Sequence, residues 1–137
     1  MINDFREMAN DAIVEADLCI IGAGAAGISM AKYLISSKLQ VCLVESGGFE
    51  FEAATQSLYK GKNIGLKYFP LDSARLRYFG GSTNHWAGWC APLSDIDFKQ
   101  RDWVPYSGWP LTKKELEPYY VQSQKLCEVG PYRYEFD

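Results

Sequence analysis

The sequence predicts an α/β fold: a parallel, doubly wound sheet that begins near the N-terminus, followed by an aromatic-rich region of loop and helix. Two short apolar runs, 18–21 and 41–44, flank a stretch of helix formers, which is the order strand, helix, strand of a βαβ unit. A glycine-rich turn follows each run. Aromatic residues make up 15% of the 137 residues, yet only Phe5 and Tyr33 precede residue 49. The chain therefore has two regions of different composition.

The composition is that of an ordinary globular protein. Hydrophobic residues are 47% and charged residues 23%, which excludes a disordered chain and a fibre. The net charge of −3 gives no basic surface for nucleic acid, and no apolar run is long enough for direct membrane insertion. The N-terminus has no secretion-signal pattern, so we expect a cytoplasmic protein. One histidine and no Cys-x-x-Cys pair argue against a metal site. We expect buried free thiols at Cys19, Cys42, Cys90 and Cys127.

The βαβ unit occupies residues 16–48. The run 18–21 is short, apolar and rich in β-branched residues, which favours a buried parallel strand over a helix. Residues 25–38 are predicted to be helical, with Gly27 and a second small residue one turn later forming a face that can lie close to a sheet. The run 41–44 predicts the second strand. The crossover between the strands should be right-handed.

The remaining segments have weaker patterns. Residues 1–15 are predicted to be a polar tail, and 49–79 an extended segment with one short helix near 52–59. Residues 80–92 form a glycine-rich turn region, and residues 93–130 form loop and then helix.

The helix in the last segment has a clear start signal. Thr112 followed by Glu115 is a capping box, which predicts one helical turn over 113–116. Proline is disfavoured in a helix interior and suits a first turn. Pro118 therefore predicts the start of a second helix, which should run to about residue 128, before a Gly-Pro pair.

The first motif is a G-x-G-x-x-G sequence placed between the first strand and the helix. Gly22 permits a tight turn, Gly24 lets the backbone approach a pyrophosphate, and Gly27 lets helix and strand pack closely. Glu45, 18 residues after Gly27, ends the next strand, where a carboxylate can accept from ribose hydroxyls and repels a 2′-phosphate. The pattern predicts a Rossmann-like site for NAD or FAD, and the alternative is a structural turn without a ligand. The predicted cofactor contacts here are Gly22, Ala23, Gly24, Ala25, Gly27, Glu45 and Ser46.

The second motif is Gly80-Gly-Ser-Thr-Asn-His-Trp86. Paired glycines let a backbone come close to a ligand, and short polar side chains supply hydrogen bonds. On spacing alone, the glycines can equally form a simple turn, and the chain's one histidine can be a packing residue. The predicted cofactor contacts here are Gly80, Gly81, Ser82, Asn84 and His85.

The two motifs together resemble those of the glucose-methanol-choline (GMC) oxidoreductases, a family of flavoenzymes. The resemblance continues through Glu45-Ser-Gly-Gly48 and Ser107-Gly-Trp-Pro-Leu-Thr-Lys-Lys-Glu-Leu-Glu-Pro-Tyr-Tyr120. It covers residues 16 to 130 approximately. The later stretches are more specific than the glycine motif, which many flavoproteins share.

The resemblance implies an FAD-dependent oxidoreductase acting on an alcohol group, with a sugar or polyol as the small-molecule substrate. The first motif would bind the ADP part of FAD, and Gly80–Gly81 would run along the pyrophosphate toward the isoalloxazine. His85 follows Gly80 by five residues, the spacing at which pyranose-oxidase-like and choline-oxidase-like members attach a histidine covalently to the flavin. Other members carry a histidine there without the bond. The resemblance leaves both linkages open.

The same resemblance implies that important parts lie outside this chain. In the family, the substrate-binding sheet and a catalytic histidine base come from later sequence, and the one histidine here is assigned to the flavin. No catalytic residue is therefore predicted in this chain. We expect residues 16–137 to be the N-terminal part of an FAD-binding domain, inactive without a C-terminal domain or partner chain. The alternatives are a fragment of an NAD-dependent dehydrogenase and a non-catalytic remnant or binding module.

Overall fold

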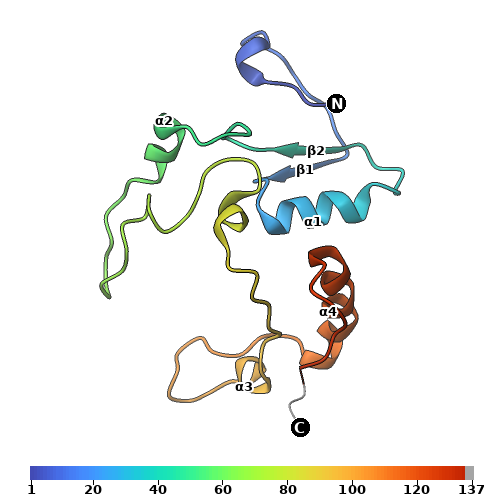
Figure 1. Ribbon diagram of the computed structural model, residues 1–137, viewed down its shortest axis with the longest axis vertical. Helices are drawn as coiled ribbons and strands as arrows, with labels where there is room; N and C mark the ends of the chain where they lie inside the picture. Colours follow the sequence, from blue (N-terminus) through green and yellow to red (C-terminus); the bar gives the residue numbers. More distant parts are fainter. Residues whose placement is uncertain (135–137) are drawn as a thin grey trace. The chain divides into compact units, whose positions relative to one another are not determined.

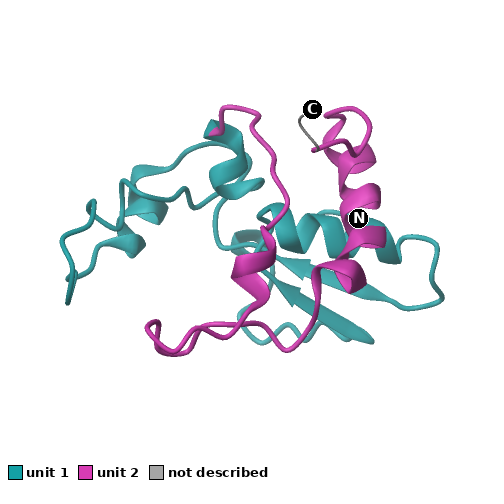
Figure 2. Ribbon diagram, turned by 90° about the horizontal axis from the view of Figure 1, so that it is seen from below, with its two compact units in different colours: residues 1–85 teal, residues 86–137 magenta. Residues whose placement is uncertain are grey.

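The computed structural model describes residues 1–134. The chain divides into two compact units, Met1–His85 and Trp86–Asp137 (Figure 2). The division falls inside the segment 80–92 that the sequence sets apart. Each unit is described by itself below.

The first unit is built on the predicted βαβ arrangement. Strand β1 (Leu18–Ile21) is followed by helix α1 (Ala25–Leu34) and strand β2 (Val41–Val44) (Figure 1). The strands pair in parallel, with Leu18 opposite Val41. Both strands have the predicted bounds, whereas α1 ends at Leu34 rather than at residue 38. The α/β fold class is confirmed.

Helix α1 lies against the sheet at Gly27. A Cβ atom at this position would lie 1.9 Å from the carbonyl oxygen of Gly22 and 3.4 Å from Cγ2 of Ile20. Any side chain would therefore force the helix away from the turn that precedes it. Ile20 is buried under this contact and, with the fully buried Ala23, forms the small core of the unit.

The strands are less buried than the sequence predicts. Ile20 is buried, but the other β1 residues are exposed, and Ile21 is 87% exposed. The sheet has two strands within the described residues, so it is an incomplete doubly wound sheet. Such strands are buried only when more strands and a second layer of helices cover them. The cysteines are free, as predicted, but Cys19 and Cys127 are exposed and Cys42 and Cys90 are only half-buried, so the predicted burial of the four thiols is wrong.

The rest of the first unit is mostly irregular. The predicted short helix near 52–59 is confirmed as helix α2 (Ala53–Gln56) followed by the 3₁₀ turn Ser57–Tyr59. Further 3₁₀ turns occupy Phe5–Glu7 and Gly81–His85.

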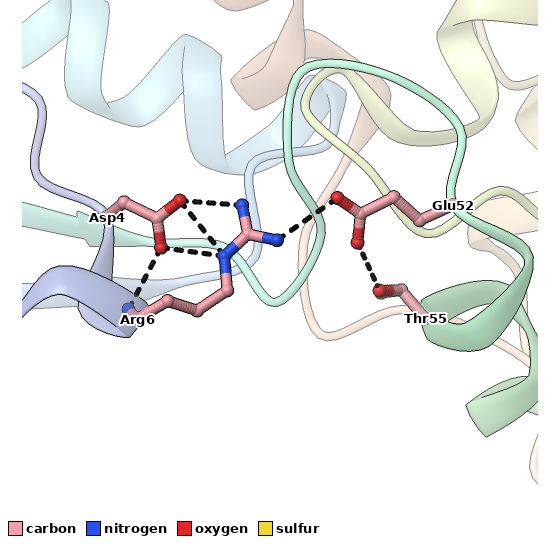
Figure 3. A network of polar contacts seen from close by, with 4 residues as sticks. All are labelled: Asp4, Arg6, Glu52 and Thr55. Atoms are coloured by element: carbon pink, nitrogen blue, oxygen red, sulfur yellow. Dashed lines mark hydrogen bonds and ion pairs between the residues drawn. The ribbon is translucent and has the colours of Figure 1, made fainter.

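An exposed polar network joins the N-terminal tail to the start of α2 (Figure 3). The Arg6 guanidinium donates to Asp4 Oδ2 at 2.6 Å and to Glu52 Oε1 at 3.4 Å. Glu52 also accepts from the Thr55 hydroxyl at 2.9 Å. The Arg6 side chain lowers the pKa of Asp4 to about 2.

The second unit contains two capped helices. Helix α3 (Asp95–Phe98) was not predicted, although its capping box of Ser94 and Asp97 is visible in the sequence. Helix α4 (Lys113–Cys127) begins with the predicted capping box of Thr112 and Glu115. No helix in the part of the chain that the structure describes is long and apolar enough to span a membrane.

Helix α4 corrects one prediction and agrees with another. It runs continuously through Pro118, so the predicted break there is wrong. Proline at this place removes one main-chain bond to the preceding turn, and the intact cap and later turns hold the helix. The helix ends at Cys127, close to the predicted end at about residue 128, and its C-cap is Glu128, whose backbone is left-handed (φ 55°).

Candidate functional site

Three turns that are far apart in the sequence meet in the first unit. The Gly80 N–H donates to the Ala23 carbonyl oxygen at 2.8 Å, and the Phe79 N–H donates to the Gly48 carbonyl oxygen at 2.9 Å. A Cβ atom on Gly81 would lie 3.3 Å from the Gly24 Cα atom. We call the three segments 22–27, 45–48 and 80–81 the glycine cradle. Both sequence motifs therefore belong to one site.

The first turn of the cradle has the geometry of an anion site. Gly22 has a φ of +99° and its N–H donates to the Val44 carbonyl oxygen at 2.7 Å, which joins the turn to the end of β2. The first i→i−4 bond of α1 runs from the Ile28 N–H to Gly24. The amides before Ile28 thus have no acceptor within the helix. A Cβ atom on Gly24 would have nothing within 4 Å. Free helix amides beside open space fit a pyrophosphate.

Glu45 connects the second turn to the first. Its Oε2 atom accepts from the Ala23 N–H at 2.8 Å. Its Oε1 atom accepts from the N–H groups of Ser46 at 2.9 Å and Gly47 at 3.0 Å. Partial burial raises the pKa of Glu45, but these backbone bonds outweigh it and hold the pKa below its ordinary value. The carboxylate is therefore ionised at neutral pH.

These bonds give Glu45 a structural role that the sequence did not indicate. A carboxylate has about four acceptor positions. Three are taken by backbone N–H groups, and the Ser46 hydroxyl lies 3.3 Å from Oε1. The Glu45 Oε2 atom accepts a single N–H group, so the predicted ribose contact has an acceptor position on this oxygen.

Gly47 closes the second turn against the segment that leads to the third. A Cβ atom there would lie 2.3 Å from the Arg77 carbonyl oxygen and 2.6 Å from the Tyr78 Cα atom. Gly47 is a cradle residue that the sequence reasoning missed. The sequence signal for it is the pair Gly47-Gly48 shortly after β2.

The polar side chains of the second motif hold their own turn. The Ser82 hydroxyl accepts from the Leu76 N–H at 3.1 Å. The Asn84 amide donates to the carbonyl oxygens of Phe79 at 2.9 Å and Gly81 at 3.1 Å. The predicted roles of Ser82 and Asn84 in cofactor binding remain predictions, and their observed partners are backbone groups of this turn.

His85 ends the 3₁₀ turn that begins at Gly81, and its side chain is exposed. At a rise of about 2 Å per residue, the turn places His85 about 8 Å along its axis from Gly81. The histidine thus lies one short turn away from the cradle.

The comparison with protein families supplies what the geometry leaves open. Residues 17–133 match the family described as DAO, FAD dependent oxidoreductase. The chain belongs to this family. The match decides between NAD and FAD in favour of FAD, and it confirms an FAD-dependent oxidoreductase with a Rossmann-like FAD-binding fold. Comparisons with curated proteins and with solved structures gave no match.

Proposed function

We propose that this chain is the FAD-binding part of a GMC-type oxidoreductase that oxidises an alcohol group of a sugar or polyol. The observation that carries the proposal is the contact of Gly80–Gly81 with the first turn, made by the Gly80 N–H and the Ala23 carbonyl oxygen at 2.8 Å. A turn that only ended the extended segment would not require this contact with the first turn. The order of motifs through residue 120 also supports an enzyme of the GMC type.

The cradle residues have distinct proposed roles. Gly24 and the first amides of α1 would hold the pyrophosphate, because they combine free N–H groups with open space. Glu45 would face the adenosine ribose while holding the two turns together. His85 would lie beside the flavin ring. FAD, when bound, supplies a two-electron acceptor for a hydride.

The rest of the enzyme is proposed to come from a C-terminal domain or a partner chain in the cytoplasm. Alcohol oxidation needs a base for the hydroxyl proton, and the one histidine of the chain is assigned to the flavin. The exposed face of β1 at Ile21 is the kind of apolar surface that further strands and helices cover.

Anaerobic reduction of the bound flavin tests the substrate class. The chain is purified with its flavin together with the C-terminal domain or partner chain proposed to complete it, and is mixed with a primary alcohol, a polyol, an aldose and an amino acid in separate samples. We expect the oxidised flavin absorbance to bleach with hydroxyl compounds and to persist with the amino acid. Bleaching by the amino acid alone would contradict an alcohol substrate. Bleaching only by dithionite would support the non-catalytic alternative.

Acid precipitation of the same protein tests the linkage at His85. Flavin that stays with the pellet in the wild type and is released from His85→Ala shows a covalent bond at this residue. Flavin in the wild-type supernatant shows that the protein holds its flavin without a covalent bond.

A further inference from the structure

One buried polar side chain outside the motifs is fully engaged by the segment that leads to the cradle. Gln56, the last residue of α2, is 7% exposed. Its Nε2 atom donates to the carbonyl oxygens of Asp72 at 2.6 Å and Arg75 at 2.7 Å. Its Oε1 atom accepts from the Arg77 N–H at 2.9 Å. A flipped amide would set oxygen against two carbonyls, so the partners fix the orientation of Gln56.

The segment held by Gln56 runs directly into the cradle. The Arg77 carbonyl lies against Gly47, where a Cβ atom would be 2.3 Å away. Two and three residues later, Phe79 and Gly80 make the bonds to Gly48 and Ala23 that define the third turn. The Arg77 guanidinium adds a second connection, 4.8 Å from the ring centroid of Tyr59. The placement of Gly80 therefore depends on how residues 72–77 are anchored.

We infer that Gln56 is the positioning residue that holds the Gly80–Gly81 turn against the first turn and thereby sets the affinity for FAD. The inference rests on the proposed location of the cofactor at the glycine cradle. The apparent dissociation constant of a ligand rises as the binding-competent fraction of the protein falls. A buried amide that loses its partners makes the docked segment less stable relative to a detached one.

Two substitutions separate the contributions of the amide. Gln56→Leu keeps a similar volume and removes all three bonds. Gln56→Glu keeps the acceptor for the Arg77 N–H but places a carboxylate oxygen where the NH₂ group faces the carbonyl oxygens of Asp72 and Arg75. Gln124→Leu is the matched control, because Gln124 is also 7% exposed and bonds the Tyr134 hydroxyl in the second unit.

Two measurements on the full chain report the effect. Titration of the apoprotein with FAD gives the dissociation constant. Amide hydrogen exchange reports Phe79 and Gly80, with the strand amides of Ile20 and Val44, which the parallel ladder bonds, as the internal reference.

We expect Gln56→Leu to raise the FAD dissociation constant about tenfold and Gln56→Glu to raise it at least as much, because its second oxygen would face two carbonyl oxygens, with Gln124→Leu unchanged. Exchange should accelerate at Phe79 and Gly80 and stay slow in the strands. Faster exchange at all four amides would show general destabilisation and overturn the positioning role. An unchanged dissociation constant in Gln56→Leu, with weaker binding in Gly24→Ala, would also overturn it. Unchanged binding in Gly24→Ala as well would show that the proposed cofactor site itself is wrong.

Discussion

The two units of this chain are held by contacts of different range. In the first unit, backbone groups of distant turns meet, as between Gly80 and Ala23, which are 57 positions apart. In the second unit, the helix caps close over three residues, as between Thr112 and Glu115. The cradle thus depends on tertiary contacts at glycines, whereas the capped helices depend on local bonds. A substitution that destabilises one unit should therefore leave the other unit folded.

The chain offers a separate reporter for each unit. All four tryptophans lie in the second unit, at Trp86, Trp89, Trp103 and Trp109. Tryptophan fluorescence therefore follows that unit, and FAD binding follows the cradle. The predictions below use these reporters to tell effects on the two units apart.

The largest effect is expected from Gly27→Ala. The new Cβ atom would lie 1.9 Å from the backbone oxygen of Gly22, which no side-chain rotation relieves. We expect a loss of about 3 kcal/mol in the stability of the first unit and loss of FAD binding. Circular dichroism melts and FAD titration measure the two effects.

Gly61→Ala is the control for adding one methyl group. Its Cβ atom would lie 2.9 Å from Cδ1 of Leu71, a side-chain end that can rotate away. Normal FAD affinity in Gly27→Ala would contradict the close contact of α1 with the first turn.

A smaller effect is expected from Glu45→Gln. The carboxylate accepts from three backbone N–H groups, and an amide would turn its NH₂ toward at least one of them. We expect a loss of about 1–3 kcal/mol from the first unit and unchanged tryptophan fluorescence. Chemical denaturation followed by both reporters measures it, and a shift in the tryptophan transition would argue against separate units.

The same residue predicts a pH dependence. Because the pKa of Glu45 is lowered in the folded chain, its stabilisation is present above the ordinary value of 4.5 and is lost as the pH falls through the folded-state value. We expect the first unit of the wild type to lose stability over this acidic range. The loss should be smaller in Glu45→Gln, and an equal loss in both proteins would assign it to other carboxylates.

A modest effect confined to the second unit is expected from Thr112→Ala. The Thr112 hydroxyl accepts from the Glu115 N–H at 3.3 Å, and loss of such an N-cap costs about 1 kcal/mol. The tryptophan-detected melting temperature should fall, and Thr112→Ser should restore it. A parallel fall in FAD affinity would show that the cradle depends on α4.

The smallest effect is expected from Arg6→Gln. The network of Arg6 with Asp4 and Glu52 is solvent-exposed, and such pairs contribute little to stability. We expect no measurable change in either reporter. A clear drop in FAD affinity would show that the N-terminal tail supports α2 and, through it, the cradle.

The elements with strong local signals could be predicted from the sequence. Both strands and the start of α4 follow from apolar runs and a capping box. The exposure of the strands could not be predicted from these runs, because a strand is buried only when further strands and helices cover it, and the described residues do not supply them. The continuation of α4 through Pro118 was not predicted. Proline removes one main-chain hydrogen bond, and the other bonds of this long helix outweigh that loss.

The sequence predicted which residues come together in the cradle better than it predicted their contacts, and binding of FAD by these residues stays a prediction. The motif spacing pointed to Gly22, Gly24 and Gly27, because the turn between a strand and a helix requires glycine at each of these positions. The meeting of Gly80 with Ala23 and the bonds of Gln56 are tertiary, and no local pattern encodes them. Glu45 was found by its position, whereas its bonds to three amides required the structure.

The most direct test of the cradle is the FAD dissociation constant of Gly24→Ala, compared with wild type and Gly61→Ala. The Gly24 Cβ would meet nothing within 4 Å, so the fold should tolerate it. The methyl group would occupy the space where the pyrophosphate is proposed to lie. We expect at least about tenfold weaker FAD binding with an unchanged melt, and Gly61→Ala should bind like the wild type. Equal affinity in all three proteins would contradict binding of FAD at this turn.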